Sequence, residues 1–81
     1  MNESFPPGPL VASGRRADVY AYQPGRVIKF LKPGYPPDWL EEESRRSLAL
    51  SAAGLPVPHC YGLVEIDGRL GLVYDDAGQR S

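Results

Sequence analysis

Glycine and proline interrupt this sequence along most of its length, and they limit how long any regular element can be. There are nine of each among the 81 residues, and they are scattered between apolar runs. Scattered breakers predict many turns and short elements, whereas a tract of them would indicate a low-complexity segment. The length predicts one small domain. A domain of this size buries only about 60% of its unfolded surface, so its stability alone is marginal.

The apolar runs between these breakers are typical of strands. They are short and rich in Val, Ile, Leu, Tyr and Phe, and β-branched and aromatic residues fit a pleated, half-buried surface. A glycine turn, a Pro-Gly turn and an Asp-Gly turn separate several of them, and the Asp-Gly pair indicates a hairpin. We therefore expect five strands, at residues 10–12, 17–22, 27–31, 60–66 and 69–74.

The segment between the third and fourth strands has the features of a helix. Asp38 is a suitable N-cap, and Glu41 three residues later completes a capping-box pattern. Gly54 is a common residue just beyond a helix end, so the helix is expected over residues 39–53. The order β-β-β-α-β-β predicts an α+β fold, in which one helix packs on a five-stranded antiparallel sheet.

Both ends of the chain are expected to lie outside this domain. Three prolines near the start resist helix formation and strand pairing. Residues 1–9 are therefore interpreted as an irregular lead-in, residues 10–74 as the domain and residues 75–81 as a linker.

Charge and cysteine content exclude several classes of partner. The net charge is −1 and the basic residues are dispersed, so neither nucleic acid nor a membrane is an expected partner. No apolar stretch is long enough to cross a bilayer, and the first residues lack a signal-peptide pattern. Cys60 is the only cysteine, which excludes an internal disulfide and agrees with a cytoplasmic location.

A lysine lies in the middle of the third expected strand. Side chains alternate along a strand, so Lys29 shares one face with Val27 and Leu31. Ile28 and Phe30 lie on the other face. A lysine flanked in this way must extend to solvent, pair with an acid or meet a ligand anion. From the strand alone, an edge-strand lysine that reaches solvent is as good an interpretation as a functional one.

The helix offers a partner for this lysine. Helical spacing groups six residues on one of its faces: Leu40, Glu43, Ser44, Ser47, Leu48 and Ser51. Leu40 and Leu48 are expected to face the sheet, which places Glu43 on a packed stripe where a carboxylate needs a cation. Lys29 is the candidate. The alternative is that residues 41–43 form a solvated acidic first turn.

Three features follow one another in the order found in kinases. They are a glycine turn before Val19, a Val-Ile-Lys strand that contains Lys29, and a helix that carries Glu43. Residues 53–58 read Ala-Gly-Leu-Pro-Val-Pro, and residues 71–75 read Gly-Leu-Val-Tyr-Asp. Both stretches are similar to segments of aminoglycoside phosphotransferase-like proteins, one after this helix and one in the strand that leads to the hinge. Nearly the whole chain therefore resembles the N-terminal lobe of that family, which has a protein-kinase-like fold.

The resemblance implies that the chain binds ATP or GTP with Mg²⁺. Lys29 would hold the α- and β-phosphates and Glu43 would keep it aimed, while Gly14 would let the loop backbone approach the phosphates. Other matching positions would enclose the purine: Val11, Val19 and Val27 above it, Tyr74 at the back, and the carbonyl of Asp75 and the N–H of Ala77 at its edge.

The glycine turn departs from the protein-kinase pattern, because Ala12 and Ala17 occupy the outer glycine positions. This disfavours a protein kinase and favours a kinase of small molecules. The catalytic base and the Mg²⁺ ligands would come from His-Gly-Asp-x-x-x-x-Asn and Ile-Asp-Trp-like segments of a second lobe, which these 81 residues lack. The resemblance thus implies a truncated phosphotransferase with no catalytic residue in this chain, inactive alone, whose small-molecule acceptor binds the other lobe.

Two further expectations concern the surface. The sheet face that includes Val11, Val19 and Val27 would be exposed without a second lobe and would favour self-association. The alternative function is a small β-rich protein-interaction module that binds no nucleotide.

The remaining reactive residue types receive structural interpretations. One histidine and one cysteine are too few for a zinc site, and Cys60 is interpreted as a small buried residue. Arg15 and Arg16 at the loop tip could touch phosphate, but such residues are more often solvated. Tyr35 and Trp39 are interpreted as packing residues at the helix start, and Asp75 and Asp76 as hinge residues that bind no metal.

Overall fold

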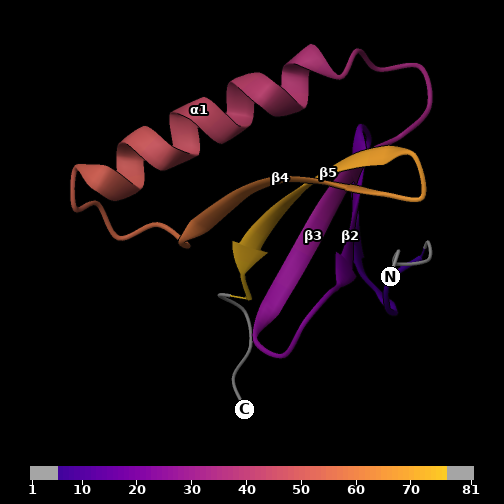
Figure 1. The fold of residues 1–81 in the computed structure, drawn as a ribbon, viewed down its shortest axis with the longest axis horizontal. Helices are drawn as coiled ribbons and strands as arrows, with labels where there is room; N and C mark the ends of the chain where they lie inside the picture. The colour runs from indigo at the N-terminus through magenta and orange to yellow at the C-terminus, as the bar shows by residue number, and fades with distance from the viewer. Residues whose placement is uncertain (1–5, 77–81) are drawn as a thin grey trace.

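The computed structural model describes residues 6–76, which form five strands and one helix (Figure 1). The elements are β1 (Leu10–Ser13), β2 (Ala17–Ala21), β3 (Arg26–Leu31), α1 (Asp38–Ala52), β4 (Cys60–Ile66) and β5 (Arg69–Asp75). Their order and the antiparallel strand pairing confirm the predicted α+β class. No helix in this part of the chain has the length and apolar character that a membrane span requires.

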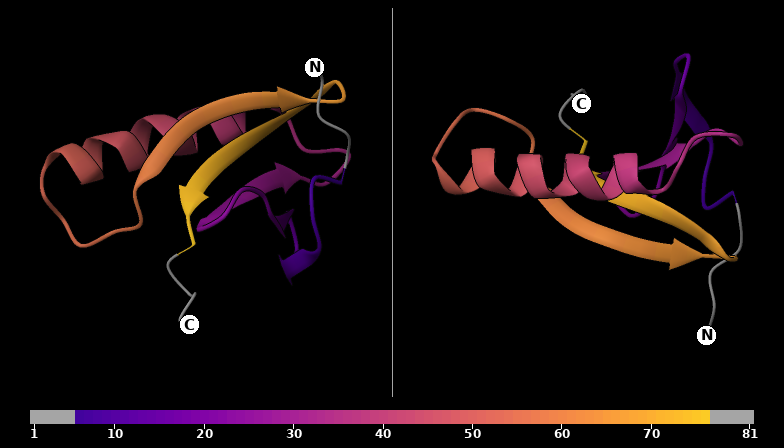
Figure 2. Two further views of the ribbon diagram at one scale, coloured as in Figure 1. Left: turned by 60° about the horizontal axis from the view of Figure 1, so that its bottom comes forward. Right: turned by 90° about the horizontal axis from the view of Figure 1, so that it is seen from above.

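The strands form one sheet in the order β1-β2-β3-β5-β4, so the last strand lies inside the sheet. α1 carries the chain from β3 to β4, and the β4–β5 hairpin then brings β5 back against β3. The helix covers one face of the sheet and crosses over β4 and β5 (Figures 1 and 2). β3 therefore lies in the centre, where Lys29 pairs with Val19 on β2 and Leu72 on β5.

Two turns have the backbone geometry that their sequences predict. Asp67 and Gly68 take positive φ values of 52° and 80°, as the two-residue turn of a hairpin requires. Before β3, Gly25 takes a φ of 78°, and the Arg26 N–H donates to the Gln23 carbonyl at 2.8 Å. Proline followed by glycine at the two central positions suits this turn.

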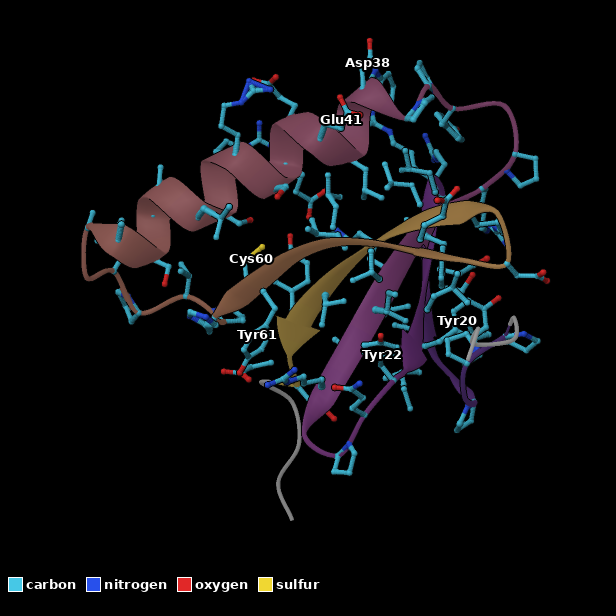
Figure 3. All side chains as sticks on the ribbon, in the orientation of Figure 1. Tyr20, Tyr22, Asp38, Glu41, Cys60 and Tyr61 are labelled. Carbon is cyan, nitrogen blue, oxygen red and sulfur yellow. The ribbon has the colours of Figure 1, made fainter. Side chains whose placement is uncertain are left out.

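The helix begins one residue earlier than the capping pattern predicts. Pro37 occupies the N-cap position with helical φ and ψ of −62° and −18°, and no side chain caps the helix there. The fixed φ of Pro37 already matches a helix, which explains the earlier start. Asp38 and Glu41 point away from the sheet (Figure 3), so the predicted capping box is wrong. At the other end, α1 ends at Ala52 and Ala53 is its C-cap. Gly54 follows with the positive φ expected of the residue after a helix C-cap.

Buried side chains form two clusters, one on each face of the sheet. The cluster on the face opposite α1 contains Ile28, Phe30, Ile66 and Val73, and the cluster beneath α1 contains Leu40, Cys60 and Leu72. Gly71 on β5 borders the first cluster, because a Cβ built on it would come within 2.7 Å of the Ile28 Cδ1 atom. The absence of a side chain at Gly71 therefore lets β5 lie beside the large residues of β3.

Only part of the predicted helix stripe faces the sheet. Leu40 and Ser44 are buried, whereas Leu48 is 45% exposed, so the expectation that Leu48 packs on the sheet is wrong. Leu48 follows Leu40 by eight residues, which places it about 80° further round the helix, at the opposite flank from Glu43. The face of α1 toward the sheet therefore consists of one leucine, Glu43 and a row of serines.

Several strand ends differ from the sequence-based bounds. β2 ends at Ala21, and the Tyr22 N–H donates to the Arg26 carbonyl in the turn that follows. β3 begins at Arg26 and β5 ends at Asp75, because these two residues pair across the strands. Asp75 therefore belongs to the sheet, and β5 extends one residue beyond the expected strand end at residue 74. Residues 77–81 of the predicted linker lie outside the described part of the chain.

The described part of the lead-in, residues 6–9, contains no helix or strand, in agreement with the prediction. It nevertheless packs against β2. The Pro9 carbonyl accepts a hydrogen bond from the Ala21 N–H at 2.9 Å. A Cβ on Gly8 would come within 2.5 Å of the Ala21 carbonyl oxygen, so glycine permits this close approach.

Candidate functional site

The predicted ion pair between Lys29 and Glu43 is formed. Lys29 lies in the middle of β3, and its Nζ donates to Oε2 of Glu43 on α1 at 2.7 Å. The two side chains are 28% and 27% exposed, so the pair is neither fully buried nor freely solvated. The alternatives of a lysine that extends to solvent and of an unpaired acidic turn do not describe these two residues.

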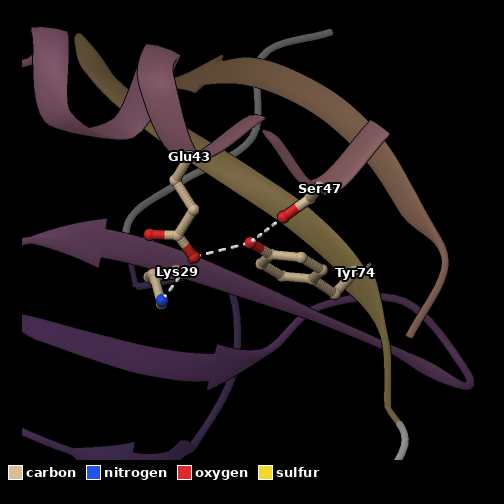
Figure 4. Close-up of polar contacts among 4 residues, drawn as sticks. All are labelled: Lys29, Glu43, Ser47 and Tyr74. Atoms are coloured by element: carbon tan, nitrogen blue, oxygen red, sulfur yellow. Dashed lines mark hydrogen bonds and ion pairs between the residues drawn. The ribbon is translucent and has the colours of Figure 1, made fainter. Parts of the chain in front are cut away.

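A tyrosine and a serine extend this pair into a network of four side chains (Figure 4). Tyr74 Oη on β5 donates to Oε2 of Glu43 at 2.6 Å and lies 3.2 Å from Oγ of Ser47 on α1. Lys29 Nζ lies 5.9 Å from the centroid of the Tyr74 ring, at the limit of a cation–π contact. β3, β5 and α1 thus contribute to one polar cluster on the helix-covered face of the sheet.

The neighbours of Glu43 stabilise its charged form. Burial acts to raise the pKa of Glu43, but the hydrogen bonds from Lys29 and Tyr74, with the charges of Lys29 and Arg46, hold it below its ordinary value. Burial of the Tyr74 phenol, followed by its hydrogen bond to the Glu43 carboxylate, raises the pKa of Tyr74. At neutral pH the cluster therefore contains a carboxylate and a protonated phenol.

A pocket of about 380 Å³ opens beside the ion pair. Its lining comes from the end of the β1–β2 turn, from β2 and β3, and from the first half of α1: Arg16, Ala17, Lys29, Leu31, Trp39, Glu42, Glu43 and Arg46. Three of these residues are cations and two are carboxylates. The excess of positive charge favours an anionic ligand.

Sequence reasoning missed most of this lining. Arg16 is exposed, as its interpretation as a solvated residue expects, and its guanidinium also lies 5.0 Å from the centroid of the Trp39 ring, a cation–π contact that joins the turn to the helix start. Trp39 is 44% exposed, so it is only partly the packing residue that we expected. No sequence spacing links Arg16 to Trp39. Arg46 could have been found, because it follows Trp39 by seven residues and so shares its helix face.

Gly14, in the predicted phosphate loop, has a backbone conformation and surroundings that would also accept a residue with a side chain. The Gly14 N–H donates to the Ala17 carbonyl at 2.9 Å, which closes the turn between β1 and β2. Gly14 does not have a positive φ, and a Cβ there would find no atom nearer than 3.8 Å. A small side chain would therefore fit at this position, and the Gly14 N–H is already used within the turn.

The three valines predicted to cover the purine are not equally placed. Val19 pairs directly with Lys29 across β2 and β3, and Val27 precedes Lys29 by two residues on the same face. Val11 lies at a bulge in the edge strand β1 and is 53% exposed. The register places Ala12, rather than Val11, opposite Val19. The sheet therefore brings two of the three valines beside the lysine.

The predicted hinge residues are only partly described. Tyr74 reaches the ion pair through its hydroxyl group. The Asp75 N–H donates to the His59 carbonyl at 2.9 Å, and its carboxylate accepts a hydrogen bond from the Tyr61 hydroxyl at 2.7 Å. Ala77 lies outside the described residues. The purine-edge roles of Asp75 and Ala77 stay predictions.

Cys60 is buried, as the sequence predicts, and it points toward α1 whereas Tyr61 points away from it (Figure 3). The His59 ring lies 4.5 Å from the Tyr61 ring in an edge-on contact. Among residues 6–76, no three His, Cys, Asp or Glu side chains are grouped so that they could hold a metal ion.

Comparison with known proteins assigns no family to this chain. No protein-family model matches the sequence, and no curated protein matches it significantly.

Proposed function

We propose that this chain is the ATP- or GTP-binding lobe of a small-molecule phosphotransferase of the aminoglycoside phosphotransferase type. The observation that carries the proposal is the 2.7 Å contact between Lys29 and Glu43. A strand lysine held by a helix glutamate is the arrangement that grips nucleotide phosphates in kinase-like enzymes. The three preceding strands, the helix and the two following strands also agree with such a lobe.

The surroundings of Lys29 support a polyphosphate ligand. Arg16 and Arg46 line the pocket beside Lys29, and hydrogen bonds between cations and phosphate oxygens are short and strong. Glu43 already holds the lysine in place, so binding need not order that side chain. The role of Gly14 in letting the loop backbone approach the phosphates stays a prediction, because its own N–H already donates to the Ala17 carbonyl.

The chemical step is assigned to groups outside this chain. When bound, Mg²⁺ would neutralise charge on the transferring phosphate. The described residues offer no cluster of metal ligands, so we derive no metal site from them. On this proposal the chain binds nucleotide but transfers no phosphate, and the acceptor is a small molecule bound by a second lobe.

The test uses the fluorescence of Trp39, which is the only tryptophan and lines the pocket. The chain is titrated with MgATP and MgGTP, with excitation at the red edge of the tryptophan band to avoid nucleotide absorbance. We expect a saturable change in emission. Lys29→Met should weaken the apparent affinity about tenfold or more, since a hydrogen-bonded charge is lost.

Lys32→Met is the matched control. It removes the same charge from a lysine that lies outside this pocket lining and near Asp18, at 3.7 Å, so binding should persist. Equal weakening by both variants would mean that net charge alone attracts the nucleotide, and the proposal would be refuted. A wild-type chain that binds neither nucleotide would refute it as well and would favour the protein-interaction module.

A further inference from the structure

The hydrogen bonds around Tyr74 run in one direction. A tyrosine hydroxyl has a single proton, and the Tyr74 hydroxyl donates it to Oε2 of Glu43 at 2.6 Å. The contact of 3.2 Å with Ser47 must therefore have the serine hydroxyl as its donor. The chain of donation runs from Ser47 to Tyr74 to Glu43, and Glu43 accepts from Lys29 through the same oxygen (Figure 4).

This arrangement fixes the position of the carboxylate on the helix. Glu43 and Ser47 are four residues apart, so they lie on successive turns of the same helix face. The Tyr74 hydroxyl contacts both, and Tyr74 itself is held in the interior strand β5, where it pairs with Val27 and Cys60. A rotation or shift of α1 would break both contacts together.

Packing alone fixes the helix less firmly. Leu40 is the buried apolar residue of α1, and the other buried residue is Ser44. Apolar packing is not directional, whereas a hydrogen bond weakens steeply as its angle departs from linear. The contacts of Tyr74 are therefore the directional constraints that set where the Glu43 carboxylate lies.

We propose that Tyr74 is a positioning residue that holds Glu43 against Lys29 through its hydroxyl group, before any ligand binds. The purpose of this arrangement rests on the proposed function, since an aimed lysine serves a phosphate ligand. The positioning itself is a property of the ligand-free chain and is tested there.

The chain contains only two lysines, Lys29 and Lys32, which makes the test internally controlled. The full chain is treated briefly with an amine-reactive ester at neutral pH, and labelling of each lysine is measured by peptide mass spectrometry. In Tyr74→Phe we expect the Lys29/Lys32 labelling ratio to rise roughly three- to tenfold, because Glu43 loses a donor and no longer stays against Lys29. Unfolding would expose both lysines and would not raise the ratio in this way.

Tyr61→Phe is the matched control, because it removes another hydrogen-bonded tyrosine hydroxyl, the one that donates to Asp75. Its labelling ratio should equal that of the wild type. Ser47→Ala is the second variant. It removes the donor to Tyr74 and should raise the ratio less than Tyr74→Phe does, since the bond to Glu43 remains.

A second readout follows the Glu43 carboxyl carbon by NMR during an acid titration. Lys29, Arg46 and Glu42 line the pocket around this carboxyl and are unchanged in every variant. In Tyr74→Phe the pKa of Glu43 should rise, because one donor to the charged form is lost.

A Tyr74→Phe chain with an unchanged labelling ratio and an unchanged Glu43 titration would overturn the proposal, and the tyrosine would then act through its ring alone. Neither measurement uses a nucleotide. A negative result for Tyr74 would therefore not change the result of the nucleotide titrations. A chain that binds no nucleotide could still show that Tyr74 positions Glu43.

Discussion

Gly71 is the position where the fold should tolerate an added methyl group least. An alanine there would place its Cβ 2.7 Å from Cδ1 and 2.8 Å from Cγ1 of Ile28, and 2.9 Å from Cε1 of Phe30. Ile28 and Phe30 are almost completely buried, so neither side chain has space to move away. We predict that Gly71→Ala destabilises the chain through overpacking between β3 and β5.

The magnitude follows from two opposing effects. Overpacking a close-packed core costs about 1–3 kcal/mol. Gly71 does not have a positive φ, so alanine also restricts the unfolded chain and returns about 0.4–1 kcal/mol. The net loss is therefore about 1–2 kcal/mol, which corresponds to a fall in Tm of roughly 5–15 °C for a domain of this size.

Thermal and urea unfolding followed by circular dichroism would measure this loss. Gly14→Ala is the control, since its added Cβ meets nothing closer than 3.8 Å and its stability should change by less than about 0.5 kcal/mol. Ile28→Val shortens the nearest side chain by the Cδ1 methyl group, so the double variant with Gly71→Ala should lose less than the sum of the two single variants. The reasoning is refuted if Gly71→Ala is as stable as the wild type, or if the two losses simply add.

Three further predictions concern single side chains. Glu43 has a lowered pKa in the folded chain, so its stabilising contribution is present above the unfolded pKa and is lost as the pH falls through the folded pKa. The gap in Tm between wild type and Glu43→Gln should therefore narrow as the pH is lowered from 7 toward about 3; a constant gap would contradict this. Leu40→Ala should lower the free energy of unfolding by about 2–5 kcal/mol, because Leu40 is 1% exposed and anchors α1. A clearly smaller loss in urea unfolding would show that other contacts hold the helix. Cys60 is 1% exposed, so its thiol should react with a colourless disulfide reagent only when the chain opens, and a rate that does not increase with urea would show that the cysteine is accessible in the folded chain.

Local sequence signals predicted the elements well where the backbone has few choices. Asp67-Gly68 and Pro24-Gly25 permit only a few turn geometries, and both turns formed as expected. Strand alternation and helix spacing made the Lys29–Glu43 pair a candidate but left a solvated lysine and a solvated acidic turn open, and the kinase-like order of motifs favoured the pair that formed. The turns needed only short-range geometry, whereas the pair also needed the resemblance.

The errors came from competition between local signals and from contacts distant in sequence. Asp38 is a good N-cap residue by type, but Pro37 before it already has helical φ and ψ. The helix therefore includes Asp38, and Pro37 takes the N-cap position. Leu48 fits a helical stripe by rough spacing, yet lies too far round the helix to reach the sheet. The bond between Tyr74 and Glu43 joins residues 31 apart, and no periodicity in a single sequence indicates a contact at that separation.

The serine-lined underside of α1 has a mechanical consequence. Leu40 is the buried apolar residue of α1, and the other side chains that face the sheet are polar and can be solvated by water. Tilting the helix about Leu40 therefore exposes little apolar surface. The hydrogen bonds of Tyr74 to Glu43 and Ser47 would break if α1 tilted in this way. The angle of α1 on the sheet is therefore set by polar contacts beside the pocket rather than by a broad apolar interface.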